Sequence, residues 1–560
     1  MRDATTSRSS LLVITAALAL SVVACGGGDA RVTRSIPGWL FFPSEALAIV
    51  WNNVFGSGEP RAEAGGQLIR HQPVDAAQPI PHTKIPQHPF MASNAGSNMH
   101  DDAYMSDTYE ARGPEGLSPE IRSRSEGFGG YGTLAVDRAG RLVGVYSNGR
   151  GFRVDLLDPY TLAKLASYAL PSRPWYWMLQ GVMPWAYIGA GMYFYLDHQD
   201  RAVVPTTENT IQVIRIPAAH HGGPLELVQV YDLAKHVVSM PWPKQDSVAW
   251  VLPDCGGDYY WYATTEGMVG TVGVESGAVH TLRLDGEKIE NSFAVGEDGV
   301  FIISDYALYR FRHDAEGKIV TDWRTVYDRG SQMKPGHITR GSGTSVTLVG
   351  GTDGLVVVTD NAEPRIDLLF VRRADGGVAC STPLFEEGRS GTDISAIAFA
   401  HADTRGNPIG RYSAIVENNW GHHRFPVAHP APGLARVDAT KREDGSYRCE
   451  LVWTSQEKNI GVMKLSLGSG LVYTYFRNDR DQITQWYLTA VDFRTGKSAY
   501  QLRVGAGQGY NNWAGALFLH PDGGIAYTTT IFGLVMMRDM PLVAGRSVLL
   551  SRTAGGRGLR

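Results

Sequence analysis

The chain has 560 residues, including 65 Gly and 29 Pro, and only 19% of its residues are charged. An apolar fraction of 43% is ordinary for a globular protein, which excludes intrinsic disorder and a collagen-like repeat. The formal net charge is −4, and basic and acidic residues are intermixed without a basic stripe, which argues against nucleic-acid binding. Low charge with abundant Gly and aromatic residues is typical of many short strands joined by tight turns.

The first 24 residues have the layout of an export signal. Arg2 and Arg8 precede an apolar run, residues 11–23, that suits a signal-peptide core and is too short to span a bilayer. This run ends in Val-Val-Ala-Cys at residues 22–25, which resembles the lipobox of bacterial lipoproteins. The resemblance implies cleavage before Cys25, a diacylglycerol on its thiol and a fatty acid such as palmitate on its amine. An ordinary secretory signal with an incidental Cys is the alternative.

The residues after Cys25 indicate where the anchor would lie. Gly26 to Gly28 are typical of a flexible tether. In Gram-negative lipoproteins an Asp after the lipidated Cys marks inner-membrane retention, and this chain has Gly there. The resemblance therefore implies a periplasm-facing anchor in the outer membrane, or the outer side of the plasma membrane in a Gram-positive cell. Two or three acyl chains hold a protein firmly to a membrane.

Residues 25–127 are predicted to be a tether and an irregular arm. They contain five closely spaced prolines and no strand alternation: Pro73, Pro79, Pro81, Pro86 and Pro89. Long irregular segments on a compact fold are usually functional or disordered. The aromatic and Met side chains of residues 88–109 favour docking, so we expect the arm to lie over the body of the protein and to cap its central channel.

The arm contains the first candidate site, His100 and Asp102 within the phrase NMHDDAYMSDTY. A His flanked by carboxylates can ligate a metal, or act as a general base whose pKa its neighbours tune. The alternative is a polar loop in which Asp102 accepts hydrogen bonds from nearby backbone amides.

Residues 128–545 read as a repeat protein. An apolar strand, an Asp-x-Gly or similar turn and a second apolar strand recur, for example from Gly132, Ser292 and Ala516. Counting such phrases gives units near 128–170, 190–235, 246–290, 291–335, 341–385, 395–455, 459–505 and 514–545. A spacing of about 40 to 60 residues matches four strands per propeller blade. We predict an all-β protein, a single β-propeller of eight four-stranded blades with seven as the alternative, followed by a tail at 546–560. Because the last unit is short, an N-terminal strand is expected to complete it.

Two further candidate sites lie within these repeats. Tyr259 and Trp261 belong to an aromatic cluster that could stack against flat ligands or simply fill the wedge between blades. Glu417, Asn418, Asn419, Trp420 and His422 leave a strand and enter a loop, where they could bind Ca²⁺ or a transition metal, or form a hydrogen-bonded loop.

The phrase Asn-Asn-Trp recurs, which suggests one ligand site on one loop face. Asn511, Asn512 and Trp513 repeat the order of Asn418, Asn419 and Trp420. Both phrases lie next to predicted inner strands, so two amide pairs and two indoles could gather there.

Beyond Cys25 the chain has three cysteines, Cys255, Cys380 and Cys449. An exported compartment permits disulfides, and we favour a Cys380–Cys449 bridge because both residues lie in strand-like segments near the ends of repeats. Three buried free cysteines are the alternative. The chain has no CxxC, CxxCH or adjacent Cys pair, which argues against thioredoxin and cytochrome functions.

Residues 487–507 and the segment after them resemble the repeats of quinoprotein-type (PQQ-like) propellers. The matching positions are Ala490, Asp492, Thr495, Gly496, Lys497, Gly524, Tyr527 and Gly533. In that family the pattern is structural, since it packs blade against blade and turns the outer hairpin. Its quinone-dependent alcohol dehydrogenases hold PQQ between a Trp and an adjacent-cysteine disulfide ring, over a metal. This chain lacks that Cys pair, so neither PQQ nor a divalent metal has a complete motif.

Two functions remain open. The first is a membrane-anchored envelope lipoprotein that binds a small molecule or a partner protein through its loop face, since non-catalytic relatives of this shape include envelope assembly scaffolds. The second is an exported enzyme, either a quinone-dependent oxidoreductase or a lyase or lactone hydrolase. For the enzyme we expect His100, Asp102, Glu417 and His422 to converge at the channel mouth. A scaffold instead predicts an apolar patch on a face or rim.

Overall fold

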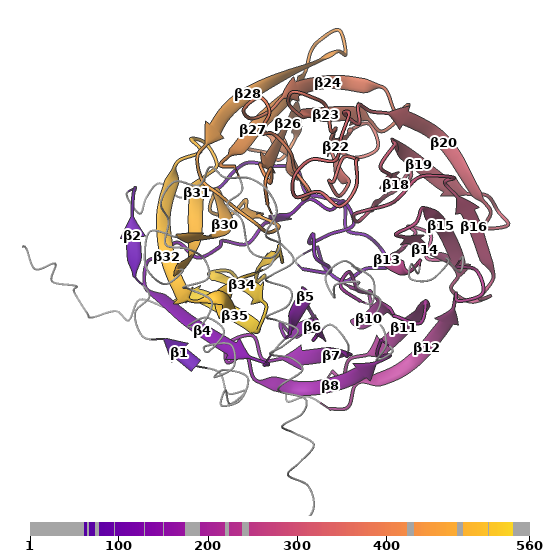
Figure 1. Cartoon of the computed structure of the whole chain (residues 1–560), viewed down its shortest axis with the longest axis horizontal. Helices are drawn as coiled ribbons and strands as arrows, with labels where there is room; N and C mark the ends of the chain where they lie inside the picture. Colours follow the sequence, from indigo (N-terminus) through magenta and orange to yellow (C-terminus); the bar gives the residue numbers. More distant parts are fainter. Residues whose placement is uncertain are drawn as a thin grey trace, which may run out of the picture. The chain divides into compact units, whose positions relative to one another are not determined.

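The strands form eight mainly antiparallel sheets arranged around one axis as the blades of a β-propeller (Figure 1). This computed structural model describes residues 61–63, 67–72, 78–94, 96–127, 129–148, 151–173, 191–218, 223–237, 246–422, 431–478, 485–512 and 514–540. All of them belong to the unit Ile49–Arg560. The prediction of an all-β propeller with eight blades is confirmed, and the alternative of seven is wrong.

Blades 1 to 4 each contain four strands, from the innermost outward. Blade 1 comprises β5 Gly130–Val136, β6 Leu142–Ser147, β7 Phe152–Leu157 and β8 Lys164–Leu170. Blade 2 comprises β9 Tyr195–Leu196, β10 Arg201–Pro205, β11 Thr210–Arg215 and β12 Glu226–Asp232. Blade 3 comprises β13 Val248–Pro253, β14 Tyr259–Thr264, β15 Met268–Gly273 and β16 Val279–Arg283. Blade 4 comprises β17 Ala294–Gly296, β18 Gly299–Ile303, β19 Ala307–His313 and β20 Ile319–Val326.

Blades 5 to 8 continue the ring, and the N-terminal strands join the last two. Blade 5 comprises β21 Thr347–Val349, β22 Leu355–Thr359, β23 Asp367–Arg372 and β24 Val378–Pro383. Blade 6 comprises β25 Ile397–Ala402, β26 Pro408–Glu417, β27 Leu434–Lys441 and β28 Tyr447–Ser455. Blade 7 comprises β29 Lys464–Ser466, β30 Leu471–Asn478, β31 Gln485–Asp492 and β32 Ser498–Ala506, flanked by β3 Thr108–Tyr109 and β2 Leu68–Arg70. Blade 8 comprises β33 Leu517–Leu519, β34 Ile525–Thr530, β35 Gly533–Asp539, β4 Pro119–Ser125 and β1 Arg61–Glu63.

An N-terminal strand closes the ring, as the short last repeat predicted. β4 pairs along its whole length with β35, so blade 8 is built from both ends of the described chain. The propeller therefore includes residues before the expected start at 128. The arm is irregular over most of its described length, but it contributes β1 to β4, of which β1 to β3 are too short to leave an alternating pattern in the sequence.

The turns between strands follow from the Asp and Gly residues of the repeat. Asp137 Oδ1 accepts the backbone N–H groups of Ala139 (3.0 Å) and Arg141 (2.8 Å), and Gly140 has a φ of +77°. An Asp side chain that binds the backbone two residues on mimics a turn, and Gly takes a positive φ without steric cost. The Asp-x-x-Gly phrase therefore reverses the chain locally.

The positions that resemble PQQ-like repeats join neighbouring blades. Gly496 has a φ of +70°, and a Cβ on it would lie 2.7 Å from Trp453 Cδ2 in the preceding blade. The Trp453 indole N–H donates to the Phe493 carbonyl at 2.8 Å. Gly376 and Trp323 repeat this arrangement between blades 4 and 5. The turn at Thr495-Gly496-Lys497 thus packs against an indole of the preceding blade, consistent with a structural role.

The arm contacts the inner strands of several blades, or the residues next to them, before it enters the channel. It makes backbone hydrogen bonds first to blade 7, then to blade 6 and then to blade 2: Ile80 N–H to Leu467 O (2.8 Å), Thr83 N–H to Ala400 O (2.9 Å) and Ala92 N–H to Leu196 O (2.9 Å). In Figure 1 this indigo-to-purple segment lies in the middle of the ring.

Residues 96–109, here called the plug, run inside the ring of inner strands. Six of the eight blades donate a backbone N–H to a plug carbonyl: Val136 to Gly96, Leu196 to Ser97, Val295 to Ala103, Leu348 to Tyr104, Ala398 to Ser106 and Leu465 to Asp107, at 2.8 to 3.1 Å. β3 then pairs in parallel with β29. Every residue of the plug is buried. The plug therefore occupies the axis of the propeller.

Candidate functional site

The first predicted site lies inside the plug. His100 Nδ1 is 3.1 Å from both carboxylate oxygens of Asp107, and its Nε2 is 3.4 Å from Ser345 Oγ. Asp107 also accepts hydrogen bonds from Lys464 Nζ and Ser395 Oγ, each at 2.5 Å. Asp102 accepts the Ser106 hydroxyl at 2.5 Å and the Ser106 N–H at 3.3 Å. Asp102 thus serves the local backbone, as the alternative interpretation of this loop described.

The three carboxyl groups of the plug have opposite pKa shifts. Burial raises the pKa of Asp102 to about 7 and that of Asp101 well above its usual range. Burial would also raise the pKa of Asp107, but the charges of Lys464 and His100 outweigh it and hold this pKa below its usual value. The Asp107 carboxylate is thus paired with Lys464 and also contacts His100, whereas burial favours the neutral form of Asp101.

The backbone of the plug is strained around this cluster. Asp101, Met105 and Asp107 have φ values of +84°, +58° and +57°, a region that residues with a Cβ rarely adopt. Such conformations persist only where the surroundings over-determine them. Here the six blade-to-plug hydrogen bonds and the buried ion pair provide that constraint.

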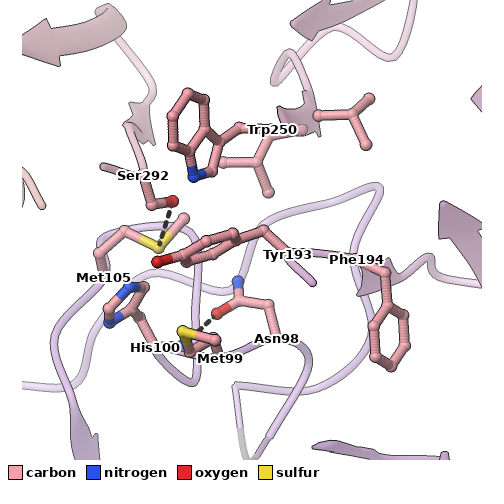
Figure 2. A pocket seen from close by; sticks show the side chains of 10 residues that line it. Asn98, Met99, His100, Met105, Tyr193, Phe194, Trp250 and Ser292 are labelled. Carbon is pink, nitrogen blue, oxygen red and sulfur yellow. Dashed lines mark hydrogen bonds between the residues drawn. The ribbon is translucent and has the colours of Figure 1, made fainter. Parts of the chain in front are cut away.

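A small cavity lies between the plug and the inner strands of blades 2 and 3. Its lining includes His100, Met105, Tyr193 and Trp250, and Figure 2 shows these side chains around one space, with Ser292 Oγ 4.0 Å from Met105 Sδ. The cavity volume is about 20 Å³. That is room for about one water molecule, whereas ligand sites occupy roughly 300 to 1,000 Å³.

The second predicted site forms a hydrogen-bond network. It lies at the end of the propeller opposite to the one where the arm contacts the inner strand of blade 6. Asn419 Nδ2 donates to Glu417 Oε1 at 2.5 Å, and Asn459 Nδ2 donates to Glu417 Oε2. Asn419 Oδ1 accepts the Thr392 hydroxyl at 3.0 Å and the Asp393 N–H at 3.1 Å. Burial raises the pKa of Glu417 to about 8 despite the two amide donors. The network is closed and buried.

The remaining residues of this loop brace the turn. Asn418 Nδ2 donates to the Arg389 carbonyl at 2.8 Å, and Asn418 Oδ1 accepts the Trp420 N–H at 3.1 Å. The Trp420 ring lies 5.7 Å from the Arg389 guanidinium. His422 is buried, and its backbone N–H donates to the Asn419 carbonyl at 2.8 Å.

The structure brings the two Asn-Asn phrases to one neighbourhood, with Asn459 between them. Asn459 Nδ2 donates to the Gly461 carbonyl, and a Cβ on Gly461 would lie 2.6 Å from Asn512 Nδ2. Asn512 Nδ2 donates to Gly515 O at 3.3 Å, and its buried Oδ1 has no partner. Asn511 is also buried and accepts the Ile531 N–H through its carbonyl at 2.9 Å. Trp513 lies outside the described residues, as does Cys25.

The site residues Lys464 and Asn459, and the buried His337 outside these sites, were not singled out from the sequence. Lys464 interrupts the apolar alternation of the phrase MKLSL, and a charged residue within a buried strand is itself a signal. Asn459 carries no such mark. His337 is buried without a hydrogen-bond partner for either ring nitrogen, and burial, followed by the charge of Lys334, lowers its pKa to about 4.

The aromatic candidates Tyr259 and Trp261 pack between blades 3 and 4. The Tyr259 ring lies 4.5 Å from that of His313, whose Nε2 is 2.7 Å from Asp254 Oδ2. Trp261 is buried, 6.3 Å from the same imidazole. These side chains fill the wedge between blades and do not form an open stacking surface.

Cys380 and Cys449 form a disulfide, the pair favoured from the sequence. Their Cα atoms are 5.7 Å apart, and the bond joins β24 of blade 5 to β28 of blade 6. Cys255 is a free thiol, and burial raises its pKa to about 12.

The described residues do not fit the groups that PQQ-like propellers imply. The plug fills the axis, where a channel-bound quinone would need space. Among the described residues no group of three or more His, Cys, Asp or Glu side chains is arranged to hold a metal ion. No helix in the described ranges is long and apolar enough to cross a membrane.

Comparison with known proteins yields similarities to solved structures. No family model and no curated protein matches the chain. BamB from Moraxella catarrhalis is 11% identical over 78% of this chain and 97% of its own, with a TM-score of 0.35. Quinohemoprotein alcohol dehydrogenase from Comamonas testosteroni is 10% identical over 79% of this chain and 77% of its own, with a TM-score of 0.44. Saccharomyces cerevisiae Sqt1 is 10% identical over 61% and 94%, with a TM-score of 0.35. The eight-bladed arrangement itself rests on the strand pairing of this chain.

Proposed function

We propose that this chain is an exported, lipid-anchored β-propeller that binds a partner protein through its loop face. The loop face is the end of the ring that carries the turns between the second and third strands of each blade and the connections between blades. The observation that carries the proposal is a group of exposed apolar side chains on this face, in contrast to the buried and hydrogen-bonded ionisable residues of the candidate sites.

This group, here called the loop patch, belongs to blade 4 and to the connection from blade 4 to blade 5. Its members are exposed by 37 to 62%: Tyr306, Val326, Met333 and Ile338. Tyr306 follows β18, Val326 ends β20, and the other two belong to the connection to β21, so all four lie at one end of the blade. The guanidinium of Arg329 stacks 3.2 Å above the Tyr306 ring. Exposed apolar patches with a polar rim are typical of protein interaction sites.

The enzyme alternative receives less support from the geometry. His100 and Asp102 lie within the plug, whereas Glu417 ends β26 and His422 belongs to the loop that follows this strand. His100 and Asp102 form hydrogen bonds to other plug residues, and Glu417 forms one to Asn419 of that loop. A catalytic site needs room for a substrate beside its acid and base. The cavity next to His100 holds about one water molecule.

The test compares two faces of the full-length, membrane-anchored chain. Met333→Asp with Ile338→Asp places charges on the loop patch, while Ile409→Asp changes a similarly exposed residue at the other end of blade 6. After reversible cross-linking and purification, we expect at least one protein that co-purifies with the wild type and with Ile409→Asp to be lost from the loop-patch variant. Equal recovery from both variants, or a stoichiometric quinone or metal in native mass spectrometry and elemental analysis, would overturn the proposal.

A further inference from the structure

The fourth strands of the eight blades, counted outward from the first strand of each repeat, lie at the rim of the propeller. They are β8, β12, β16, β20, β24, β28, β32 and β4, and they lie on the circumference of the ring in Figure 1. The outer edge of such a strand presents unpaired backbone N–H and C=O groups to which another strand can add. Soluble proteins protect these edges by covering them or by interrupting them with bulges.

The chain covers two of these edges with its own N-terminal strands. β1 pairs with β4 through Arg61 opposite Ser123 and Glu63 opposite Ile121. β2 pairs with β32, with Ile69 opposite Gln501. Each added strand forms three residue pairs. Strand addition at the rim is therefore a contact that this fold already makes.

Six outer strands are interrupted by a shift in register against their inner neighbour. The shifts occur in β8, β12, β20, β24, β28 and β32. The other two outer strands, β4 and β16, pair without a shift. β1 covers β4, so β16 is the one outer strand of the described sheets that is both regular and uncovered.

The register of blade 3 shows which groups of β16 face outward. Gly273 N–H donates to Ala278 O and Leu284 N–H donates to Gly267 O, so the even-numbered residues bond to β15. In an antiparallel pair the alternate residues point their backbone groups away from the partner strand. Val279, Thr281 and Arg283 therefore direct their N–H and C=O groups to the outer side. Within the part of the chain that the structure describes, these outward groups form no hydrogen bond.

We propose that β16 binds an extended segment of a partner protein, which adds to blade 3 as a fifth strand. Main-chain hydrogen bonds to Val279, Thr281 and Arg283 supply the affinity, as in other strand-addition complexes. The half-buried side chains of Val279 and Leu282 lie on opposite faces of the strand, so the segment carries β-branched or aromatic residues on both of its faces and no proline. This site is separate from the loop patch.

The test uses two substitutions at one position of the full-length chain. Thr281→Pro removes the outward N–H, and an edge strand tolerates proline where that N–H is not used by the sheet. Thr281→Ala retains the N–H and is the matched control. After reversible cross-linking in the native membrane, we expect Thr281→Pro to recover at least about tenfold less of the partner than Thr281→Ala. The loop-patch variant keeps this partner, so failure here is distinguishable from failure of the loop-face proposal.

Amide hydrogen exchange provides a second measurement that needs no variant. In the wild-type complex the amides of Val279, Thr281 and Arg283 should exchange at least about tenfold more slowly than in the free chain, while those of the bulged edge β12 do not change. Equal recovery of the partner with Thr281→Pro and Thr281→Ala would overturn the proposal. Unchanged exchange at these amides in the complex, or no recovered partner, would do so as well.

Discussion

The ammonium group of Lys464 lies 2.5 Å from the carboxylate of Asp107, and neither side chain is exposed. Lys464 begins the innermost strand of blade 7, and Asp107 belongs to the plug, so the pair fixes the arm to the ring. Lys464 Nζ also donates to the Met99 carbonyl. A buried ion pair is costly to form, but it is more costly to break on one side only, because an uncompensated charge remains.

Lys464→Met should therefore destabilise the protein strongly. Removing one partner of a buried pair typically costs about 3 to 5 kcal/mol. The double variant Asp107→Asn with Lys464→Met should lose less than Lys464→Met alone, since no charge is left unpaired. The control is Lys497→Met at an exposed position. Urea unfolding of the wild type and the three variants measures the differences, and a midpoint for Lys464→Met equal to that of the control would contradict the stabilising role of the pair.

Stability should fall as the pH rises through the titration of Glu417. Its pKa is raised from 4.5 to about 8 in the folded protein, so the folded state binds this proton more tightly than the unfolded state. That contribution is fully present below about pH 4.5 and disappears as the pH passes about 8. Asp102, with its pKa raised to about 7, acts in the same direction. The pKa of Asp107 is lowered, so its contribution to stability is lost only as the pH falls into the acid range.

The measurement is the free energy of unfolding between about pH 5 and pH 8 for the wild type and Glu417→Gln. The amide introduced by Glu417→Gln cannot ionise, so the slope against pH should become flatter even though one hydrogen bond to a neighbouring amide is lost. The slope is the informative quantity, because the lost hydrogen bond shifts all values alike. Parallel curves for the two proteins would show that Glu417 does not titrate in this range.

Gly496→Ala should be more harmful than Gly445→Ala. Both glycines have positive φ values, +70° and +82°, so both substitutions cost backbone strain. Only at Gly496 does a Cβ meet a neighbour, Trp453 Cδ2 at 2.7 Å, whereas Gly445 has nothing within 4 Å. Overpacking of this kind costs about 1 to 3 kcal/mol, which is the expected difference in stability between the two variants. Equal decreases in the thermal unfolding midpoint of the two variants would refute the packing of Gly496 against Trp453.

The architecture was predictable because its signals are local. Asp137 and Gly140 lie within one short turn and shape it by themselves, and the same phrase recurs often enough to count blades. A structural role in blade packing was also predictable for Gly496, because its phrase resembles the repeats of PQQ-like propellers. Such short-range chemistry is written in consecutive residues.

The candidate sites were less predictable because their partners are distant in the sequence. The hydrogen bond from Lys464 to Asp107 joins residues separated by 357 positions, and that from Asn459 to Glu417 joins residues separated by 42. A polar residue that serves a buried network has the same appearance in the sequence as one that serves a substrate. His100 and Glu417 were therefore identified as notable, but their surroundings could only come from the structure.

Reduction of the disulfide should lower stability and leave the fold otherwise intact. Cys380 and Cys449 are separated by 69 residues and join the outer strands of adjacent blades. A bridge of this kind contributes about 2 to 4 kcal/mol, mainly by restricting the unfolded chain. Thermal unfolding with and without dithiothreitol should show a lower midpoint in the reduced wild type, and Cys380→Ser should match that value in either condition. Cys255→Ser is the control and should respond to reductant like the wild type, because its thiol forms no bridge. An equal midpoint for oxidised and reduced wild type would mean that blades 5 and 6 are held by packing alone.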